Sequence, residues 1–407
     1  MNRGFQVAVV ASSTCVVGLL LFGALHSNGA TPNDSPYPHL GVYTEVLSHI
    51  QTDYVEEPDM KAVTNGAING MLESLDPFAS YLNADQYKQY LATKQNPKAS
   101  VGLYLSKRLG YMMVVDSLPG SPAAKAGLTT GDILETINNI STHDMPLAFA
   151  EIILQGDPGT TVKMSVLRTV RSDPQDVTLT RAAIVNPPLA SHLEPADQVG
   201  VITSSSLDEA RVREISQKIG DLSKQGAKSL ILDLRHCTTG DPQAGVALAN
   251  LFMDKGLIGY TQGQKSSKQE FQAAAAKQVT KLPLVVLTDR GTAGAAEVAT
   301  AALLESKRAQ VVGEHTFGDA AVRKAVTMDD GSAVILSVAK YYGPNGKPIQ
   351  DNGPDFGVVP SVLQAETEAA PEVDENAPEG QDTPPPAKTG PDLILQKALE
   401  TIHKGLA

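Results

Sequence analysis

Residues 121–139 read SPAAKAGLTTGDILETINN, a turn punctuated by glycine and proline that runs into a strand-like stretch. The surrounding sequence has the same texture, with the runs VGLYLS and YMMVVDSL before it and TTVKMSVLRT and DVTLTRA after it. One helix-like run, PLAFAEIILQG, interrupts the alternation. Short strands separated by glycine and proline predict a small β-rich domain with helical caps over residues 97–183.

Residues 184–363 change to an alternation of strands and helices. The runs VGVITSSS, KSLILDLR, PLVVLTDR and AQVVGE are continuous apolar strands, and helical patterns such as AGAAEVATAALLES lie between them. This order predicts βα units around a sheet that is buried on both faces. Further along, VRKAVTM and SAVILSVAKYYG flank the turn Asp329-Asp330-Gly331, whose Asp-Gly step predicts an antiparallel hairpin.

The N-terminus begins with an apolar stretch. Residues 5–25 contain no charge and, as a helix rising ~1.5 Å per residue, span roughly 31 Å, about one hydrocarbon core. The length favours an uncleaved membrane anchor, while the small residues Ser27, Gly29 and Ala30 leave a cleaved signal open. We therefore interpret residues 1–30 as a signal anchor or signal peptide and expect the remainder to be exported.

Helical segments flank the two central domains. Residues 38–96 contain apolar side chains at spacings of three and four, with Asn83 as a helix cap, and predict a helical cap or interface segment. Residues 364–391 are acidic and rich in proline, which predicts a disordered linker. Residues 392–407 predict a final helix that docks on this chain or on a second copy. Its apolar stripe is Leu395, Leu399, Ile402 and Leu406.

Composition limits what the chain can bind. The 407 residues carry a formal net charge of −12, which repels a phosphate backbone and argues against nucleic acid as a partner. Cys15 lies in the apolar stretch, so Cys237 has no partner for a disulfide and no cysteine-based metal site is expected. We expect neither a metal site nor a cofactor.

The β-rich segment resembles a PDZ domain of the exported-protease type. The resemblance rests on residues 121–139, with GLYL upstream and GDPGTTVKMSVLR downstream. It implies that an extended peptide adds to a sheet edge, with its terminal carboxylate held by backbone N–H groups of a glycine-containing loop. Here that loop is Gly102, Leu103, Tyr104 and Leu105. The other interpretation is an ordinary strand start with a routine glycine.

The order of all the blocks resembles the C-terminal processing peptidases, also called tail-specific proteases, which are Ser/Lys endopeptidases with a PDZ domain. Its markers, from about residue 41 to 362, include DYVEEP, AINGMLESLDPFASYL, ILDLR, GLIGYTQG, VVGEHTFG and DDGSAVILSVAKYYGPNGKPIQ. The resemblance implies a multidomain α/β and α+β protein, with an N-terminal helical segment, a PDZ-like domain and a protease-like α/β core. It also implies a bacterial cell-envelope location, either anchored in the inner membrane and facing the periplasm or exported.

The positions that carry this family's chemistry are substituted. The family nucleophile is the second serine of a G-S-A-S-A-S-E type segment, and the matching stretch GTAGAAE places Gly294 there. The family lysine and glutamine correspond to Asp319 and Arg323. In the oxyanion region the family's Pro-Gly pair is replaced by Thr238 and Thr239, followed by Gly240. A glycine cannot attack a carbonyl, and the reaction also needs a neutral lysine and oriented N–H donors.

Other residues offer weaker routes to catalysis. Thr292 could act as a relocated nucleophile, with Lys324 as a displaced lysine, but neither inherits the family geometry. His236 and Cys237 are adjacent, and neighbours at a strand end point to opposite sides. We expect Cys237 to be a small residue in a loop.

Two further combinations involve Asp319. His315 with Glu314 and Asp319 fits no standard metal-ligand spacing. Asp319 and Arg323 could instead form an ion pair if the segment brings them together.

The leading hypothesis is an exported, membrane-anchored homologue that is proteolytically inactive. It would bind polypeptide C-termini, unfolded proteins or an active protease relative through its PDZ domain and vestigial cleft. The alternative is an active serine-type or threonine-type periplasmic endopeptidase that processes protein C-termini. A third interpretation is a structural subunit that assembles through its terminal helices, and a homo-oligomer is compatible with each. The sequence alone does not decide between an inactive homologue and an active endopeptidase.

Overall fold

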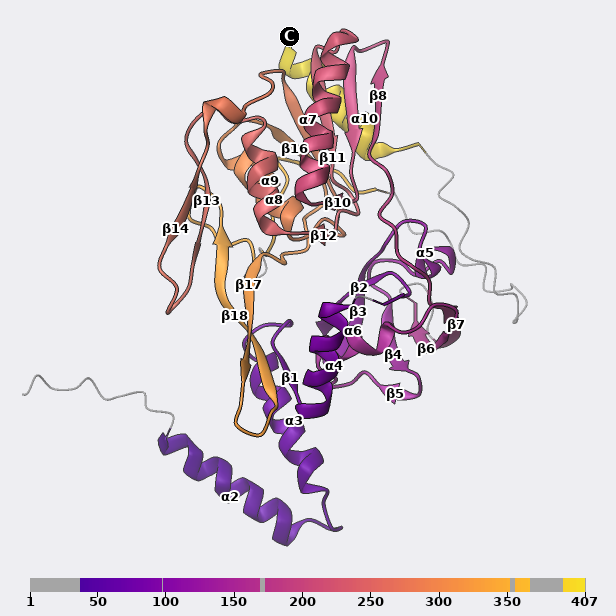
Figure 1. Cartoon of the computed structure of the whole chain (residues 1–407), viewed down its shortest axis with the longest axis vertical. Helices are drawn as coiled ribbons and strands as arrows, with labels where there is room; N and C mark the ends of the chain where they lie inside the picture. The colour runs from indigo at the N-terminus through magenta and orange to yellow at the C-terminus, as the bar shows by residue number, and fades with distance from the viewer. Residues whose placement is uncertain (1–36, 97, 169–172, 352–355, 367–390, 407) are drawn as a thin grey trace, which may run out of the picture. The chain divides into compact units, whose positions relative to one another are not determined.

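A computed structural model describes residues 37–96, 98–168, 173–351, 356–366 and 391–406 (Figure 1). The chain divides into two compact units, the second of which is Gly66–Ala407. The predicted membrane segment 5–25 and most of the predicted linker lie outside the described residues. Within those described, no helix combines the length and the apolar character needed to cross a bilayer.

The first unit contains helix α2, Tyr37–Asp53, and the beginning of α3, Met60–Glu73. Both helices lie where the apolar spacing predicts them. The side chains of Val42 and Val46, which contribute to that spacing, are exposed rather than buried. The Asp59 carboxylate accepts the N–H groups of Lys61 and Ala62 and thereby caps α3.

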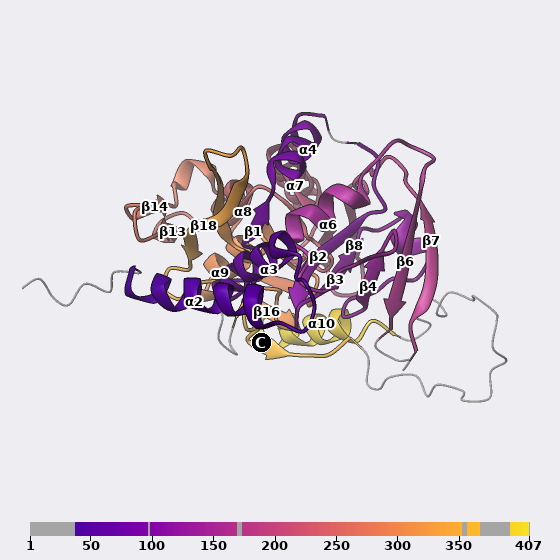
Figure 2. The same cartoon turned by 90° about the horizontal axis from the view of Figure 1, so that it is seen from below.

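The β-rich segment forms an antiparallel sheet in the order β2-β3-β4-β6-β7, with β5 paired to β4. Its strands lie side by side in Figure 2. Ser121 caps the short helix α5, and α6 contributes Leu147 and Leu154 to the buried core. The elements are β2 Leu103–Arg108, β3 Tyr111–Ser117, α5 Pro122–Lys125, β4 Ile133–Ile137, β5 Ile140–Ser141, α6 Leu147–Leu154, β6 Thr161–Leu167 and β7 Gln175–Thr180.

The second predicted domain contains a six-stranded sheet in the order β19-β16-β15-β11-β9-β8. All neighbours are parallel except β8 and β9, as the predicted βα units require. Its elements are β8 Ala190–Glu194, β9 Val199–Thr203, α7 Glu209–Lys224, β11 Ser229–Asp233, α8 Pro242–Asn250, β15 Leu284–Thr288, α9 Ala295–Glu305, β16 Gln310–Gly313, β19 Val362–Leu363 and α10 Leu393–Leu406.

Helices cover both faces of this sheet. The helices α7, α8 and α9 pack on one face, and α10 packs on the other (Figures 1 and 2). The final helix therefore docks on its own chain, which answers one of the alternatives left by the sequence.

The predicted stripe of α10 is confirmed in part, because Ile402 is buried and Leu395 and Leu399 pack against the same cluster. Ile394, Ala398 and Ile402 are buried, whereas Leu395 and Leu399 are only partly buried. Arg235 ties the start of this helix to the end of β11, because its Nη1 and Nη2 donate to Asp392 at 2.9 and 2.8 Å.

A second, antiparallel sheet carries the predicted hairpin. Its order is β1-β18-β13-β14, with β17 paired to β18. These strands are β1 Ser80–Leu82, β13 Leu257–Gln262, β14 Gln269–Gln272, β17 Ala321–Thr327 and β18 Ala333–Tyr342. The sequence did not predict β1, which joins the helical segment to β18, or the short parallel pair β10 Ser206–Leu207 and β12 Thr239–Gly240. Asn83 caps α4, Ala84–Gln95, as predicted, and η1 is Ala275–Lys277.

Candidate functional site

Gly294 lies at a sharp corner between β15 and α9. Its φ of +59° and ψ of −115° belong to a region that glycine adopts without strain. A Cβ at this position would have only one close neighbour, the Asp319 carbonyl oxygen at 3.6 Å. A strained strand-to-helix corner is where α/β-hydrolases present a nucleophile. The backbone therefore turns from strand to helix as a nucleophile corner does, with a glycine at the turn.

Glu297 joins the Gly294 corner to the segment that contains Asp319. This side chain is fully buried, and its Oε2 accepts the N–H groups of Gly294 and Asp319 at 3.0 and 2.7 Å. Its Oε1 accepts the Gly318 N–H and the Thr316 hydroxyl, each at 2.5 Å. Burial raises the pKa of Glu297 to about 7, against the effect of these donors. This role of Glu297 was not predicted from the sequence, although a glutamate in a helix's first turn is a capping signal.

Asp319, at the family's lysine position, belongs to a polar network between two domains. Its carboxylate accepts hydrogen bonds from Arg323 on β17 and from the Tyr104 hydroxyl on β2. The Arg323 guanidinium also donates to Gln350 at 3.2 Å and lies 4.0 Å from the centre of the Phe78 ring. Burial and the charge of Asp319 raise the pKa of Tyr104 well above its usual value, so the hydroxyl keeps its proton.

The suggested ion pair between Asp319 and Arg323 is thus present, while its third member was not foreseen. Tyr104 lies 215 positions from Asp319 in sequence, and no local signal links the two residues.

His236 forms a second contact between the same two domains. Its Nδ1 lies 3.1 Å from the Asp116 carboxylate on β3 and 3.3 Å from that of Asp289. The Asp289 carboxylate also accepts the backbone N–H of His236. Although burial opposes protonation, the two carboxylates raise the pKa of His236 to about 9. The imidazolium is therefore the form that holds this contact at neutral pH.

The predicted oxyanion region is held in place by backbone pairing, with Thr239 half-buried and Gly240 exposed. Thr239 and Gly240 form β12 and pair with β10, and the Cys237 carbonyl accepts the Ala293 N–H at 3.0 Å. A Cβ on Gly240 would lie 1.9 Å from the Leu207 carbonyl oxygen, so only glycine fits there. The Thr238 and Thr239 hydroxyls have no hydrogen-bond partner among the residues described.

The weaker catalytic routes receive little geometric support. Thr292 is fully buried, and its hydroxyl donates to the Leu234 carbonyl and to Asp289, each at 2.9 Å. Cys237 is fully buried and burial raises its pKa, whereas the His236 ring is partly exposed. Lys324 is exposed on β17.

His315 also remains without a metal-ligating set. In the described parts of the chain, no three His, Cys, Asp or Glu side chains are placed to hold a metal ion.

The predicted peptide-binding loop leads into the edge strand β2. In the described chain β2 pairs on one side only, with β3, and Gly102 before it has a φ of +79°. Beside β2 lies a cavity of about 420 Å³ that the β-rich domain, α4 and the core enclose together. It is lined by Phe78, Tyr90, Leu91, Lys94, Tyr104, Leu105, Leu147, Ala148, Glu151, Asp319, Arg323, Ala325 and Ile335.

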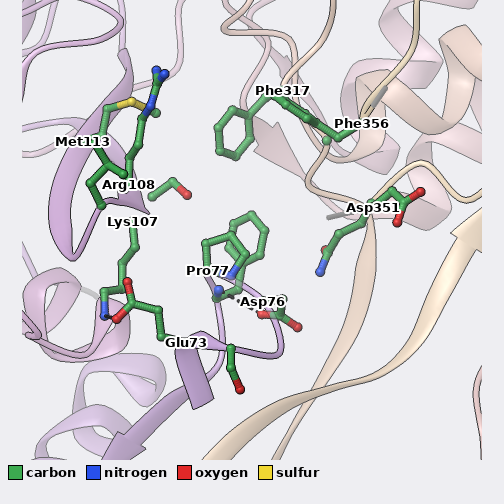
Figure 3. A pocket seen from close by; sticks show the side chains of 15 residues that line it. Glu73, Asp76, Pro77, Lys107, Arg108, Met113, Phe317, Asp351 and Phe356 are labelled. Carbon is green, nitrogen blue, oxygen red and sulfur yellow. Dashed lines mark hydrogen bonds and ion pairs between the residues drawn. The ribbon is translucent and has the colours of Figure 1, made fainter. Parts of the chain in front are cut away.

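A second cavity, of about 570 Å³, lies on the other side of Phe78. In Figure 3, Met113, Arg108 and Lys107 line one wall and Phe317 and Phe356 line the facing wall. Phe317 also makes edge contacts with Phe78 and Tyr104. The aromatic cluster and the Asp319 network thus separate two cavities.

Comparison with known proteins finds the same three parts. A model of peptidase family S41 matches residues 198–362, a PDZ domain model matches 113–168, and a model of the N-terminal domain of the activating protease CtpB matches 27–86. The carboxy-terminal processing protease CtpA of Bacillus subtilis is 32% identical over 88% of this chain and 80% of its own length. The carboxyl-terminal-processing protease of Synechocystis sp. is 33% identical over 75% of this chain and 73% of its own.

Among solved structures, the photosystem II D1 C-terminal processing protease matches with a TM-score of 0.66 at 27% identity, covering 82% of this chain and 89% of that one. A PDZ domain next to a mostly parallel α/β core defines a PDZ-bearing peptidase fold. The chain belongs to peptidase family S41, and the relatives compared are carboxy-terminal processing proteases. The predicted family and fold class are confirmed.

Proposed function

We propose that this chain is a non-cleaving member of its family, which binds polypeptide C-termini or a partner protease through the PDZ groove and the vestigial cleft. Gly294 carries the proposal, because a residue without a side chain at the nucleophile corner cannot form an acyl-enzyme. Asp319 supports it, since a carboxylate bound by Arg323 and Tyr104 cannot replace a neutral lysine as general base.

The cavity beside β2 supports a binding role. The strand has a free edge in the described chain, and the adjoining wall includes the apolar side chains of Leu105, Leu147 and Ile335. Main-chain pairing at a sheet edge with an apolar pocket for a side chain is the general mode of peptide capture by PDZ domains. We further propose that the bound chain is engaged at the cell envelope, with residues 5–25 as the anchor.

The decisive experiment measures binding and cleavage on the same protein. Fluorescent peptides with apolar C-termini are titrated by anisotropy, and an unfolded protein is incubated with the chain and analysed by mass spectrometry. We expect saturable binding without new termini. Turnover that disappears in Thr292→Ala and persists in Thr300→Ala, a buried threonine on α9, would refute the proposal and favour the endopeptidase alternative.

Reversion tests the chemistry directly. Gly294→Ser with Asp319→Lys restores two of the altered side chains but leaves Thr238 and Thr239 in the oxyanion region. We expect turnover to stay far below the ~10⁶-fold acceleration of a complete serine-protease site. Strong activity in this double variant would contradict the argument that the oxyanion segment has lost its function.

A further inference from the structure

A third cavity, of about 400 Å³, lies where the β-rich PDZ domain meets the carboxyl edge of the core sheet. Its core residues come from the turns after β11, β15 and β16, represented by His236, Asp289 and Glu314. Asp116 and Thr130 from the PDZ domain close it. The carboxyl ends of parallel strands are where open α/β sheets bind ligands. None of the substituted catalytic positions lines this cavity.

The cavity is acidic. Four carboxylates line it, and His236 and Arg290 are the only basic residues in its lining, which leaves a formal excess of two negative charges when both are protonated. Arg290 is already paired, since its Nε lies 3.1 Å from the Glu314 carboxylate, and three quarters of its side chain is exposed to solvent. The carboxylates are Asp116, Asp289, Glu314 and Glu366.

Asp116 supplies an acceptor that the protein itself does not use. The residue is 3% exposed, and its Oδ1 accepts the Ser117 N–H at 2.8 Å and contacts His236. Its Oδ2 has no hydrogen-bond partner among the described residues. Gly291, also in the lining, leaves this oxygen uncovered, since a Cβ there would lie 3.1 Å from it. A buried carboxylate oxygen without a donor is unfavourable, and an N–H donor in the cavity would satisfy it.

We propose that this cavity binds a cationic group, a guanidinium or a primary ammonium, with Asp116 as the principal acceptor. A guanidinium is favoured, because its planar fork of donors matches carboxylates. The group could be the side chain of a bound polypeptide, which rests on the proposed function, or a free polyamine. Both sources present the same cationic group. They differ in whether an arginine-containing peptide displaces a small amine from the cavity.

The test is calorimetric titration of the full chain with agmatine, which carries one guanidinium and one ammonium. We expect one saturable site that weakens at higher salt and at least about tenfold weaker binding in Asp116→Asn. Asp254→Asn, at an exposed acid outside the cavity, is the control and should bind normally. If Asp116→Asn does not fold, Glu314→Gln is the second variant and should also weaken binding.

A pair of peptides identifies the source. An arginine-containing peptide that competes with agmatine, while its citrulline counterpart does not, supports a polypeptide side chain. Agmatine binding without competition supports a free amine. No saturable agmatine binding, or equal affinity in the folded Asp116→Asn and control variants, would overturn the proposal. If agmatine does not bind but the citrulline peptide still binds at the PDZ groove, the proposed function stands and only the cation site is refuted.

Discussion

Replacing Glu297 by glutamine tests how the Gly294 corner and the Asp319 segment are held together. In the native chain each carboxylate oxygen accepts two hydrogen bonds, and three of the four donors are backbone N–H groups that cannot reverse their role. In Glu297→Gln an NH₂ group replaces one oxygen. If the NH₂ group takes the place of Oε1, the buried N–H of Gly318 loses its acceptor. If it takes the place of Oε2, the N–H groups of Gly294 and Asp319 lose theirs.

A buried donor without an acceptor costs about 1–3 kcal/mol, so we expect Glu297→Gln to lower the unfolding free energy of the core by roughly 3 kcal/mol. The assay is urea unfolding at about pH 8.5, combined with hydrogen exchange of the peptide that covers residues 314–322. Glu305→Gln is the matched control on the same helix. Its carboxylate accepts one described N–H, from Asn345 at 2.8 Å, which a glutamine oxygen can also accept.

The opposite outcome has a clear physical meaning. Burial raises the pKa of Glu297 to about 7, so the folded state binds this proton more tightly than the unfolded state. That effect alone removes stability as the pH rises from about 4.5 to about 7. If Glu297→Gln is as stable as the native chain at high pH, the cost of burying the Glu297 charge exceeds the stabilisation by its four hydrogen bonds. Glu297 would then not hold the Gly294 corner to the Asp319 segment, contrary to our inference.

Three further predictions concern the contacts around this site. Tyr104→Phe removes a hydroxyl from a charged acceptor, so faster hydrogen exchange in β2 and a loss of about 1.5–3 kcal/mol are expected, whereas Tyr111→Phe on β3 should change neither. The raised pKa of His236, about 9, gives stability that is complete below about pH 6.5 and is lost as the pH rises through 9. The melting-temperature difference from His236→Gln should therefore shrink at high pH, and a constant difference would contradict the contact. Arg235→Ala leaves two carboxylates without their cation, so proteolysis within α10 should accelerate, and unchanged cleavage would refute this role.

The sequence predicted the elements that depend on local chemistry. Asn83 caps its helix because its side-chain oxygen accepts a nearby N–H, and the Asp-Gly step forms its hairpin. The family positions of Gly294 and Asp319 could also be assigned from motif spacing.

The remaining features depend on distant parts of the chain. The strand β1 has only three residues and exists because β18 offers an edge. Tyr104 meets Asp319 only when the PDZ domain and the core pack together. Likewise, Arg235 meets Asp392 only when α10 packs on the sheet, and helical spacing alone cannot distinguish the buried face of α10 from its neighbour.

The position of α10 constrains how this protein is made. The ribosome delivers the strands first, and the face that α10 covers stays open to water until α10 itself emerges. The apolar residues on that face are Val199, Val201, Ile231, Val285, Leu287 and Val312. A product that ends before α10, through a premature stop or a protease cut, would expose this surface to aggregation and quality control. Burial of this face of the sheet therefore requires that the chain be synthesised through α10.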